Sequence, residues 1–390
     1  MKYEIILSKI NKIVTRLIYR APDTLRDAVG VLPISSGRLS VDRRVATVIA
    51  PYLPVGRQNR MTFSEVMEGF DCSVEVRYFH AIKLVENQDE WCNRFFQQLT
   101  PRLKFVSWIK WALRDFQEKK KEIVLWPIEP WYENYYHWLT CCLPKIIECE
   151  RLVDGVLGVP VDVMSSRVKA ESLKGAVHVF TETTIISGVW EGDLACVIRK
   201  GLPIIGIRSL RERFSLRNST VNGRRIYITR TTAHYRFIEN EIDLQTILKS
   251  RNFEFVEFDG LDFSDQARAL CGASIIIGAH GAGLTNIIFA PQGSRLIEIS
   301  PDFLNDPSYL SLCLICGINY TRLAARTVSP EAPQYSNLEV DISTLERVLD
   351  SSPVPDHSNA SYFHVPADAA RVEIGGVGAS RPAWPRRARW

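Results

Sequence analysis

The chain has 390 residues, of which 46% are hydrophobic and 24% charged, so it is long enough for two ordinary domains with apolar cores. Its net charge of +4 is mildly basic, which excludes a typical nucleic-acid-binding protein but suits an anionic substrate or an anionic membrane surface. The nine cysteines are odd in number and lie mostly in apolar runs, which indicates reduced thiols and a cytoplasmic protein.

Residues 1–20 carry apolar side chains at helical spacing, with lysines and arginines largely on other faces. Lysines interrupt the apolar run, so we expect neither a signal peptide nor a transmembrane anchor. Two interpretations remain open. The segment is a basic amphipathic helix that lies peripherally on the inner membrane, or it is a first helix packed on its own domain.

Residues 21–110 show no clear alternation of element types and predict no topology. From residue 122 onward, strand-like runs alternate with helical patterns, which is typical of a parallel α/β architecture. In 224–323, helices are expected near 240–250, near 263–271 and from about 307, which predicts a Rossmann-like domain. The predicted strands are 122–128, 161–165, 176–180, 203–207, 224–230, 253–258, 273–278 and 294–300.

The segment "WYENYYHW" at 131–138 combines five aromatic rings with Glu133, Asn134 and His137. Aromatic faces stack on sugars or bases, while Asn, Glu and His supply directional hydrogen bonds. The apolar run that follows predicts a buried helix with His137 in its first turn. A buried aromatic cluster with a satisfied histidine is the alternative interpretation.

The stretch "GAHGAGLTNIIFA" at 278–290 follows a strand-like run and starts a helical pattern. Gly278, Gly281 and Gly283 are expected to permit positive φ and close approach of a ligand to the backbone. Helix N-termini beyond the carboxyl ends of parallel strands bind anions, so a diphosphate fits here. The pattern is G-x-x-G-x-G rather than G-x-G-x-x-G, which does not support a nicotinamide cofactor. Tight packing of helix on strand is the alternative.

Arg230 and Arg236 follow the predicted strand at 224–230 and are expected to open toward the same crevice as the glycine-rich turn. Arginine forks match phosphate oxygens, and a departing diphosphate needs donors already in place. Pairing of these arginines with Glu239, Glu241 or helix-end carbonyls is the alternative.

Together, "ENYYHWL" followed by "LPKI", "RRIYITR" followed by Arg236 and "ENE", and "GAHGAGLTNIIFAPQGSRLIEI" resemble glycosyltransferase family 61, over roughly 125–325. The bacterial members of that family include proteins of capsular polysaccharide biosynthesis. The resemblance implies an inverting transferase of GT-B architecture, in which two Rossmann-like domains face each other across a cleft. We accordingly expect an N-terminal domain at 1–220 on the acceptor side, a nucleotide-sugar-binding domain at 221–350 and a flexible tail at 351–390.

The resemblance also implies site residues. The donor diphosphate is expected to be held by Arg230, Arg236, His280, Gly281, Ala282 and Gly283, with Asn134 facing it from the other domain. His137 is the candidate base and Glu133 the alternative. The chain has no D-x-D triplet to hold a metal, so arginines and helix dipoles are expected to replace it.

The expected activity is transfer of a sugar from a nucleotide-sugar donor, UDP-linked, to a glycan or lipid-linked glycan, in capsular or other surface polysaccharide synthesis. No cofactor is expected besides this donor substrate. A nucleotide-sugar epimerase and a non-catalytic nucleotide-sugar-binding scaffold remain as alternatives. The tail carries arginines beside Trp384 and Trp390, which suits anionic lipid headgroups as well as it suits a solvated tail.

Overall fold

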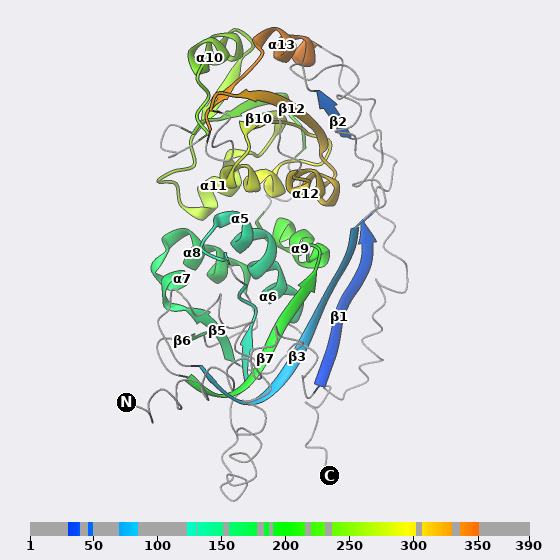
Figure 1. Ribbon diagram of the computed structural model, residues 1–390, viewed down its shortest axis with the longest axis vertical. Coiled ribbons are helices and arrows are strands. Elements are labelled where there is room, and N and C mark those ends of the chain that lie inside the picture. The colour runs from blue at the N-terminus through cyan, green and yellow to red at the C-terminus, as the bar shows by residue number, and fades with distance from the viewer. Residues whose placement is uncertain are drawn as a thin grey trace, which may run out of the picture.

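The chain folds as a mixed α/β protein with two β-sheets (Figure 1). The structure is a computed structural model. It describes residues 30–39, 46–49, 70–84, 123–129, 131–150, 156–177, 183–186, 190–214, 220–230, 236–301, 306–329 and 336–350.

The first sheet combines antiparallel and parallel strands in the order β1-β3-β7-β4-β5-β6. The long strands β1, β3 and β7 pair antiparallel, whereas β7, β4, β5 and β6 run parallel. The strands are β1 (Gly30–Leu39), β3 (Phe70–Leu84), β4 (Ile123–Trp126), β5 (Val156–Pro160), β6 (Thr183–Ile186) and β7 (Trp190–Lys200). The helices are α5 (Tyr135–His137), the π-helical η3 (Trp138–Cys142), α6 (Leu143–Cys149), α7 (Val161–Ser165), α8 (Arg167–Ala176) and α9 (Ile204–Phe214).

The second sheet has a parallel centre in the order β9-β8-β10-β11-β12, and β12 also pairs with β13 and β2. Numbered along the chain from β8, this order is 2-1-3-4-5, one of the doubly wound arrangements. The strands are β2 (Ala46–Ile49), β8 (Arg224–Ile228), β9 (Phe253–Val256), β10 (Ala273–Ala279), β11 (Arg295–Pro301), β12 (Asn319–Thr327) and β13 (Leu338–Glu339). The helices are α10 (Glu241–Ser250), α11 (Phe263–Ala269), the 3₁₀-helix η4 (Ala282–Phe289), α12 (Ser308–Cys316) and α13 (Ile342–Asp350).

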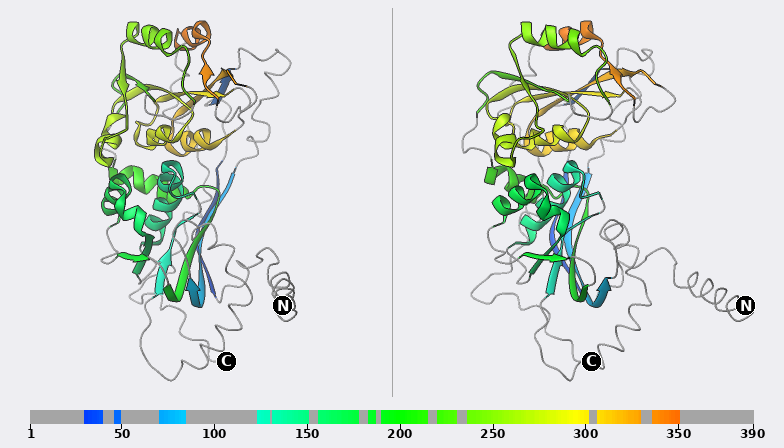
Figure 2. Two further views of the ribbon diagram at one scale, coloured as in Figure 1. Left: turned by 60° about the vertical axis from the view of Figure 1, so that its left-hand side comes forward. Right: turned by 90° about the vertical axis from the view of Figure 1, so that its left-hand side faces the viewer.

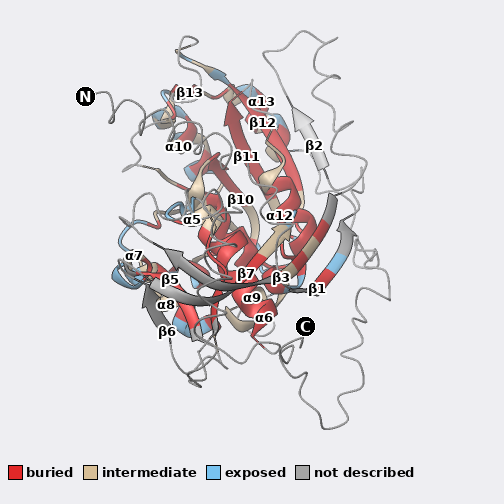
Figure 3. Ribbon diagram, turned by 60° about the horizontal axis from the view of Figure 1, so that its bottom comes forward, coloured by how far each residue is buried: buried red, intermediate tan, exposed pale blue. Residues whose placement is uncertain are grey.

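The two sheets are joined through a layer of helices. Figures 1 and 2 show α5, α6 and α9 of the first half facing α11, η4 and α12 of the second, with α10 and α13 on the outer face of the second sheet. One buried apolar cluster runs through this layer, and Figure 3 shows α6 and α12 as largely buried. Polar contacts cross it as well, because Tyr135 Oη donates to Asn286 Oδ1 (2.7 Å) and Arg211 Nη1 donates to the carbonyl of Ile288 (3.0 Å).

Local signals explain where several helices begin and end. Asp262 caps α11, because its carboxylate accepts a hydrogen bond from the backbone N–H of Asp265 (2.7 Å). Gly317 ends α12 in the left-handed conformation with φ 67°, which a residue without Cβ adopts at little cost.

Most predicted elements after residue 122 are confirmed, including the four predicted strands of the second sheet and its helices α10, α11 and α12. Two strand predictions are wrong, since 161–165 forms helix α7 and 203–207 forms the start of α9. In α9 the buried residues Ile204, Ile207 and Leu210 recur every three residues, and a short apolar run alone does not distinguish that pattern from a buried strand. The prediction at 176–180 lies largely outside the described residues.

The eight cysteines in the described part of the chain have free thiols, and seven of them are buried. Burial raises the pKa of Cys142 to about 12, so this thiol is protonated near neutral pH. None of the described helices has the length and apolar character needed to cross a membrane. The predictions for 1–20 and for the tail at 351–390 lie outside the described residues.

Candidate active site

The second sheet has a topological switch point between β8 and β10. From β8 the chain continues to β9 on one side, and from β10 it continues to β11 on the other. Ligands of doubly wound sheets bind beyond the carboxyl ends of the two strands at such a point. Arg230 follows β8 there, and the turn from His280 to Gly283 follows β10. The sheet order therefore brings together two motifs that lie fifty residues apart.

Arg230 lies directly on the glycine-rich turn. Its Nη1 donates to the carbonyl of His280 (2.7 Å). A Cβ on Gly281 would lie 2.6 Å from Nη1 and 2.8 Å from Cζ of Arg230, which no side chain tolerates without displacing the guanidinium. A side chain at position 281 would therefore displace the guanidinium of Arg230, and the expected neighbourhood of the arginine and the turn is confirmed.

The expectation of positive φ in this turn is wrong. Gly281 has φ 165° and ψ 169°, which is extended backbone, and Gly278 and Gly283 are not among the glycines with positive φ. Gly278 is small for a packing reason, since a Cβ there would lie 2.8 Å from Leu284 Cδ2. The helix that follows, beginning at Ala282, is a 3₁₀-helix rather than an α-helix.

His280 is buried and belongs to a polar chain that reaches into the sheet. Its Nδ1 lies 2.5 Å from Glu298 Oε1, and Glu298 Oε2 accepts a hydrogen bond from Tyr320 Oη (2.6 Å). Its Nε2 lies 3.9 Å from Asp306 Oδ2. Tyr309 Oη donates to the carbonyl of Gly281 (2.5 Å) and adds a second support to the turn. This row of hydrogen-bonded side chains fixes the ring of His280 and directs its Nε2 toward Asp306.

His137 lies at the start of the helix that continues from α5 through η3 to α6. Asn134 caps this helix, since its Oδ1 accepts from the N–H of Tyr136 (2.9 Å). A π-helical turn follows His137 at once, and such turns occur frequently at functional sites. The expected buried helix with His137 in its first turn is confirmed.

A row of rings connects this helix to the glycine-rich turn. Tyr136 packs edge-on against Tyr309, with ring centroids 5.7 Å apart, and Tyr309 packs edge-on against His280 at 5.3 Å. Asp306 acts electrostatically on both histidines, because it lies beside His280 and influences the pKa of His137. The helix that carries His137 in the first half is therefore in contact, through Tyr136 and Tyr309, with His280 in the second.

Burial and charge together lower the pKa of His137. Burial is the larger cause, and the neighbouring Arg199 lowers the pKa further, while Glu129 and Asp306 oppose the shift. A histidine with a lowered pKa is neutral at pH 7 and able to accept a proton. Its Nδ1 lies 3.9 Å from Cys141 Sγ, which leaves Nε2 as the nitrogen for a reacting group.

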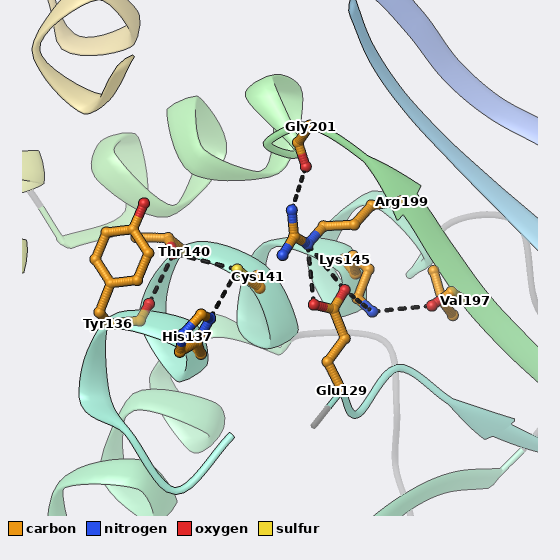
Figure 4. Close-up of polar contacts among 9 residues, drawn as sticks. All are labelled: Glu129, Tyr136, His137, Thr140, Cys141, Lys145, Val197, Arg199 and Gly201. Carbon is orange, nitrogen blue, oxygen red and sulfur yellow. Dashed lines mark hydrogen bonds and ion pairs between the residues drawn. The ribbon is translucent and has the colours of Figure 1, made fainter. Parts of the chain in front are cut away.

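Beside His137 lies a network of three charged side chains (Figure 4). Glu129 accepts hydrogen bonds from Lys145 Nζ (2.6 Å) and from Arg199 Nε (2.9 Å), and Lys145 also donates to the carbonyl of Val197 (2.9 Å). The pKa of Glu129 is lowered because the two cations outweigh the desolvation of its carboxylate. The carboxylate therefore stays ionised.

The remaining predicted residues are less closely connected to this place. Glu133 is exposed, and its electrostatic partner is Lys169 of α8. Arg236 is half-buried and has φ 62°, a conformation that costs a non-glycine residue free energy and is enriched at functional sites. The ligand roles of Glu133, Asn134 and Arg236 stay predictions.

Sequence reasoning missed Glu298, Asp306, Tyr309 and the Glu129–Arg199 pair. An acidic residue inside the apolar run "RLIEIS" is a local signal that would have found Glu298, because a buried carboxylate needs a partner. Glu129 and Arg199 are 70 residues apart and meet only through the pairing of β4 with β7, so no local pattern connects them.

Residues 135–297 match the family model described as Glycosyltransferase 61. The match includes His137, Arg230, Arg236 and the glycine-rich turn.

Two curated relatives, both animal proteins, are named as glycosyltransferases. The chain is 30% identical over 134 residues to the EGF domain-specific O-linked N-acetylglucosamine transferase of Gallus gallus, covering 30% of this chain and 25% of that protein. It is 28% identical over 138 residues to the human protein O-linked-mannose beta-1,4-N-acetylglucosaminyltransferase 2, covering 31% of this chain and 24% of that protein. The chain thus spans about a quarter of the length of these relatives.

Proposed function

We propose that this protein is an inverting, metal-independent glycosyltransferase that moves a sugar from a UDP-linked donor to a glycan acceptor. The observation that carries the proposal is the contact of Arg230 with the His280–Gly281 turn at the switch point of the second sheet. His137 approaches this turn from the other half through the Tyr136–Tyr309 contact. Such an arrangement is compatible with the GT-B-like architecture that we propose for the molecule.

The donor diphosphate binds at the switch point in this proposal. The first N–H groups of η4 carry the partial positive charge of a helix start, and the guanidinium of Arg230 lies against Gly281. Arg236, in its strained conformation, and the turn residues Ala282 and Gly283 complete the proposed donor site. Arginine and backbone N–H groups then balance the charge of the leaving diphosphate in place of a metal ion.

The transfer is a single displacement. An acceptor hydroxyl attacks the anomeric carbon on the face opposite the diphosphate, so the new C–O bond forms as the C–O bond to the diphosphate breaks and the configuration inverts. The hydroxyl proton passes to Nε2 of His137, which is neutral at pH 7 because of its lowered pKa. Asp306 faces His137 electrostatically and stabilises the imidazolium that forms.

The proposed acceptor is a glycan or lipid-linked glycan, and the proposed process is the synthesis of a surface polysaccharide such as a capsule. The names of the two relatives instead specify acceptors on proteins, so a test of glycan and protein acceptors distinguishes these two acceptor classes. We also propose a cytoplasmic location with peripheral attachment to the inner membrane through residues 1–20, five of which are Lys or Arg, and through the tail at 351–390, whose last ten residues hold four arginines and two tryptophans.

A calorimetric and thermal-shift screen against UDP, UDP-sugars and other nucleotide sugars, with EDTA present, tests the donor site. A bound donor raises the melting temperature by mass action. We expect stabilisation by UDP and by at least one UDP-sugar without added metal. If nothing in the screen binds, the proposed function is wrong, and if binding appears only after a divalent metal is added, the metal-independent part is wrong. The anomeric configuration of the product, read by proton NMR, tests inversion.

A further inference from the structure

The carboxyl ends of β4 and β7 in the first sheet carry polar side chains that the proposed donor site does not use. From β4 the chain continues through helices to β5 on one side, whereas β7 lies parallel to β4 on the other. Glu129 follows the carboxyl end of β4, and Arg199 lies at the carboxyl end of β7. Because β4 and β7 are parallel neighbours, the residues at their carboxyl ends meet at one edge of the sheet.

The polar groups at this edge bind a buried lysine on one side and are partly exposed to solvent on the other. Lys145 is fully buried and binds Glu129, while the side chains of Glu129 and Arg199 keep 15% and 22% of their surface exposed. Arg199 uses Nε for Glu129 and Nη1 for the carbonyl of Gly201. Among the residues that the structure describes, Nη2 of Arg199 has no hydrogen-bond partner. A carboxylate acceptor and a guanidinium donor are thus held side by side at a partly open surface.

The segment that follows Glu129 presents an aromatic ring to solvent. Trp131 is 70% exposed and has φ 72°, a conformation that costs a tryptophan free energy. Two backbone hydrogen bonds hold the segment, from Tyr132 N to the carbonyl of Glu129 (3.3 Å) and from Asn134 N to the carbonyl of Trp131 (2.9 Å). A strained backbone that keeps a large ring in water points to a role in binding.

His137 connects this edge to the reaction. Glu129 and Arg199 both act on its pKa, and Figure 4 shows them beside the helix that carries His137 and Cys141. A molecule bound to Glu129 and Arg199 therefore lies next to the proposed base.

We propose that Trp131, Glu129 and Arg199 form the acceptor subsite and that it takes a neutral hexopyranoside. The C–H-rich face of the sugar ring stacks on Trp131, one hydroxyl donates to Glu129, and a neighbouring hydroxyl accepts from Nη2 of Arg199. A further hydroxyl is thereby directed to His137. This inference rests on the proposed function, of which it specifies the acceptor side.

Fluorine NMR on the full chain labelled with 5-fluorotryptophan tests the subsite without a turnover assay. Trp131→Phe assigns the resonance of Trp131, and the buried Trp126 and Trp138, assigned in the same way, are internal controls. The probes are the methyl glycosides of glucose, galactose, mannose and N-acetylglucosamine, at up to about 50 mM because one small subsite binds in the millimolar range. We expect at least one glycoside to shift Trp131 in a saturable manner and to leave both buried residues unchanged.

Variants then separate binding from structural support. Saturation-transfer NMR should show that Trp131→Ala and Arg199→Lys each raise the Kd of that glycoside by about tenfold, since Lys keeps a charge beside Glu129 but loses the planar fork. Ile242→Ala removes a side chain that is 82% exposed on α10 and should not change the Kd. UDP affinity, measured by calorimetry on the same proteins, should be unchanged in all three variants.

Three outcomes overturn the inference. In the first, no glycoside shifts the fluorine resonance of Trp131 although UDP binds. In the second, Arg199→Lys lowers the melting temperature and leaves the glycoside Kd unchanged. In the third, a serine-containing peptide shifts the Trp131 resonance where no glycoside does. Each of these leaves the donor site intact. Failure of UDP to bind the unaltered chain would instead contradict the proposed function itself.

Discussion

The two sheets each present an arginine at the carboxyl ends of their parallel strands, and the two arginines are used differently. Arg199 binds the carboxylate of Glu129 through Nε, and Lys145 adds a second cation to the same carboxylate. Arg230 donates to the backbone carbonyl of His280, and its guanidinium lies against the backbone of Gly281. Both edges carry positive charge, since two cations surround the single carboxylate of Glu129, and they differ in what the arginine contacts: a carboxylate at the first sheet and a backbone carbonyl at the second. In our proposal the carboxylate of Glu129 accepts from a sugar hydroxyl at the first edge, and the start of η4 beside Arg230 donates to a diphosphate at the second.

The largest expected effect concerns Gly281, on the donor side. Gly281→Val should abolish UDP binding, because the new side chain meets the guanidinium of Arg230 and occupies the space that a phosphate would take. Calorimetry measures the binding, and the melting temperature of the unliganded variant shows whether the domain is folded. A folded variant with wild-type UDP affinity would mean that the turn only packs η4 against β10.

A double-mutant cycle sharpens this prediction. In a background that already lacks the Arg230 side chain, Gly281→Ala should add little further loss, because the clashing group is gone. Additive losses would show that Gly281 acts independently of Arg230.

His137, between the two edges, should affect turnover rather than donor binding. His137→Ala should lower kcat by roughly a hundredfold or more, the usual range for a general base, with UDP-sugar affinity nearly unchanged. Glu133→Ala, at an exposed position, is the matched comparison and should have the smaller effect. If donor affinity decreases together with kcat in His137→Ala, the histidine binds phosphate and is not the base.

Arg230→Ala should weaken UDP binding by about 1.5–3 kcal/mol, the range for hydrogen bonds to charged groups. Uridine, which has no phosphate, should bind both proteins equally. Equal loss of UDP and uridine would place Arg230 at the nucleoside or in structural support.

The sequence predicted the proximity of Arg230 and the glycine-rich turn because its signals are local. Arg230 and the glycine-rich turn each follow a strand with a clear apolar pattern, and parallel strands place their carboxyl ends at one edge. The Glu129–Arg199 edge of the first sheet could not be predicted in this way. The strands β4 and β7 become neighbours only in the folded sheet, and no local sequence pattern near Glu129 indicates that Arg199 is its partner. The same limit explains the missed strands before residue 84, whose partners lie far along the chain. The wrong strand at 203–207 has a different cause, because a short apolar run suits a buried helix equally well.

The smallest expected effect is a displacement of the pH profile, and its sign differs between the two members of the Glu129–Arg199 pair. The groups facing His137 are Arg199 of β7, Glu129 after β4, Asp306 before α12, and Cys141 and Tyr136 of its own helix. The base must be neutral, so kcat falls as the pH decreases through the pKa of His137.

Removal of the cation in Arg199→Met should raise that pKa and move the acidic limb of the kcat profile to higher pH, because Arg199 lowers the pKa in the native protein. Glu129→Gln should move it to lower pH, since the carboxylate opposes the shift. Profiles at saturating acceptor and donor measure this, and melting temperatures at each pH exclude unfolding as the cause. Movement in the same direction in both variants would show that the pair supports the fold without setting the charge of His137, and a purely positional network would leave both limbs where they are.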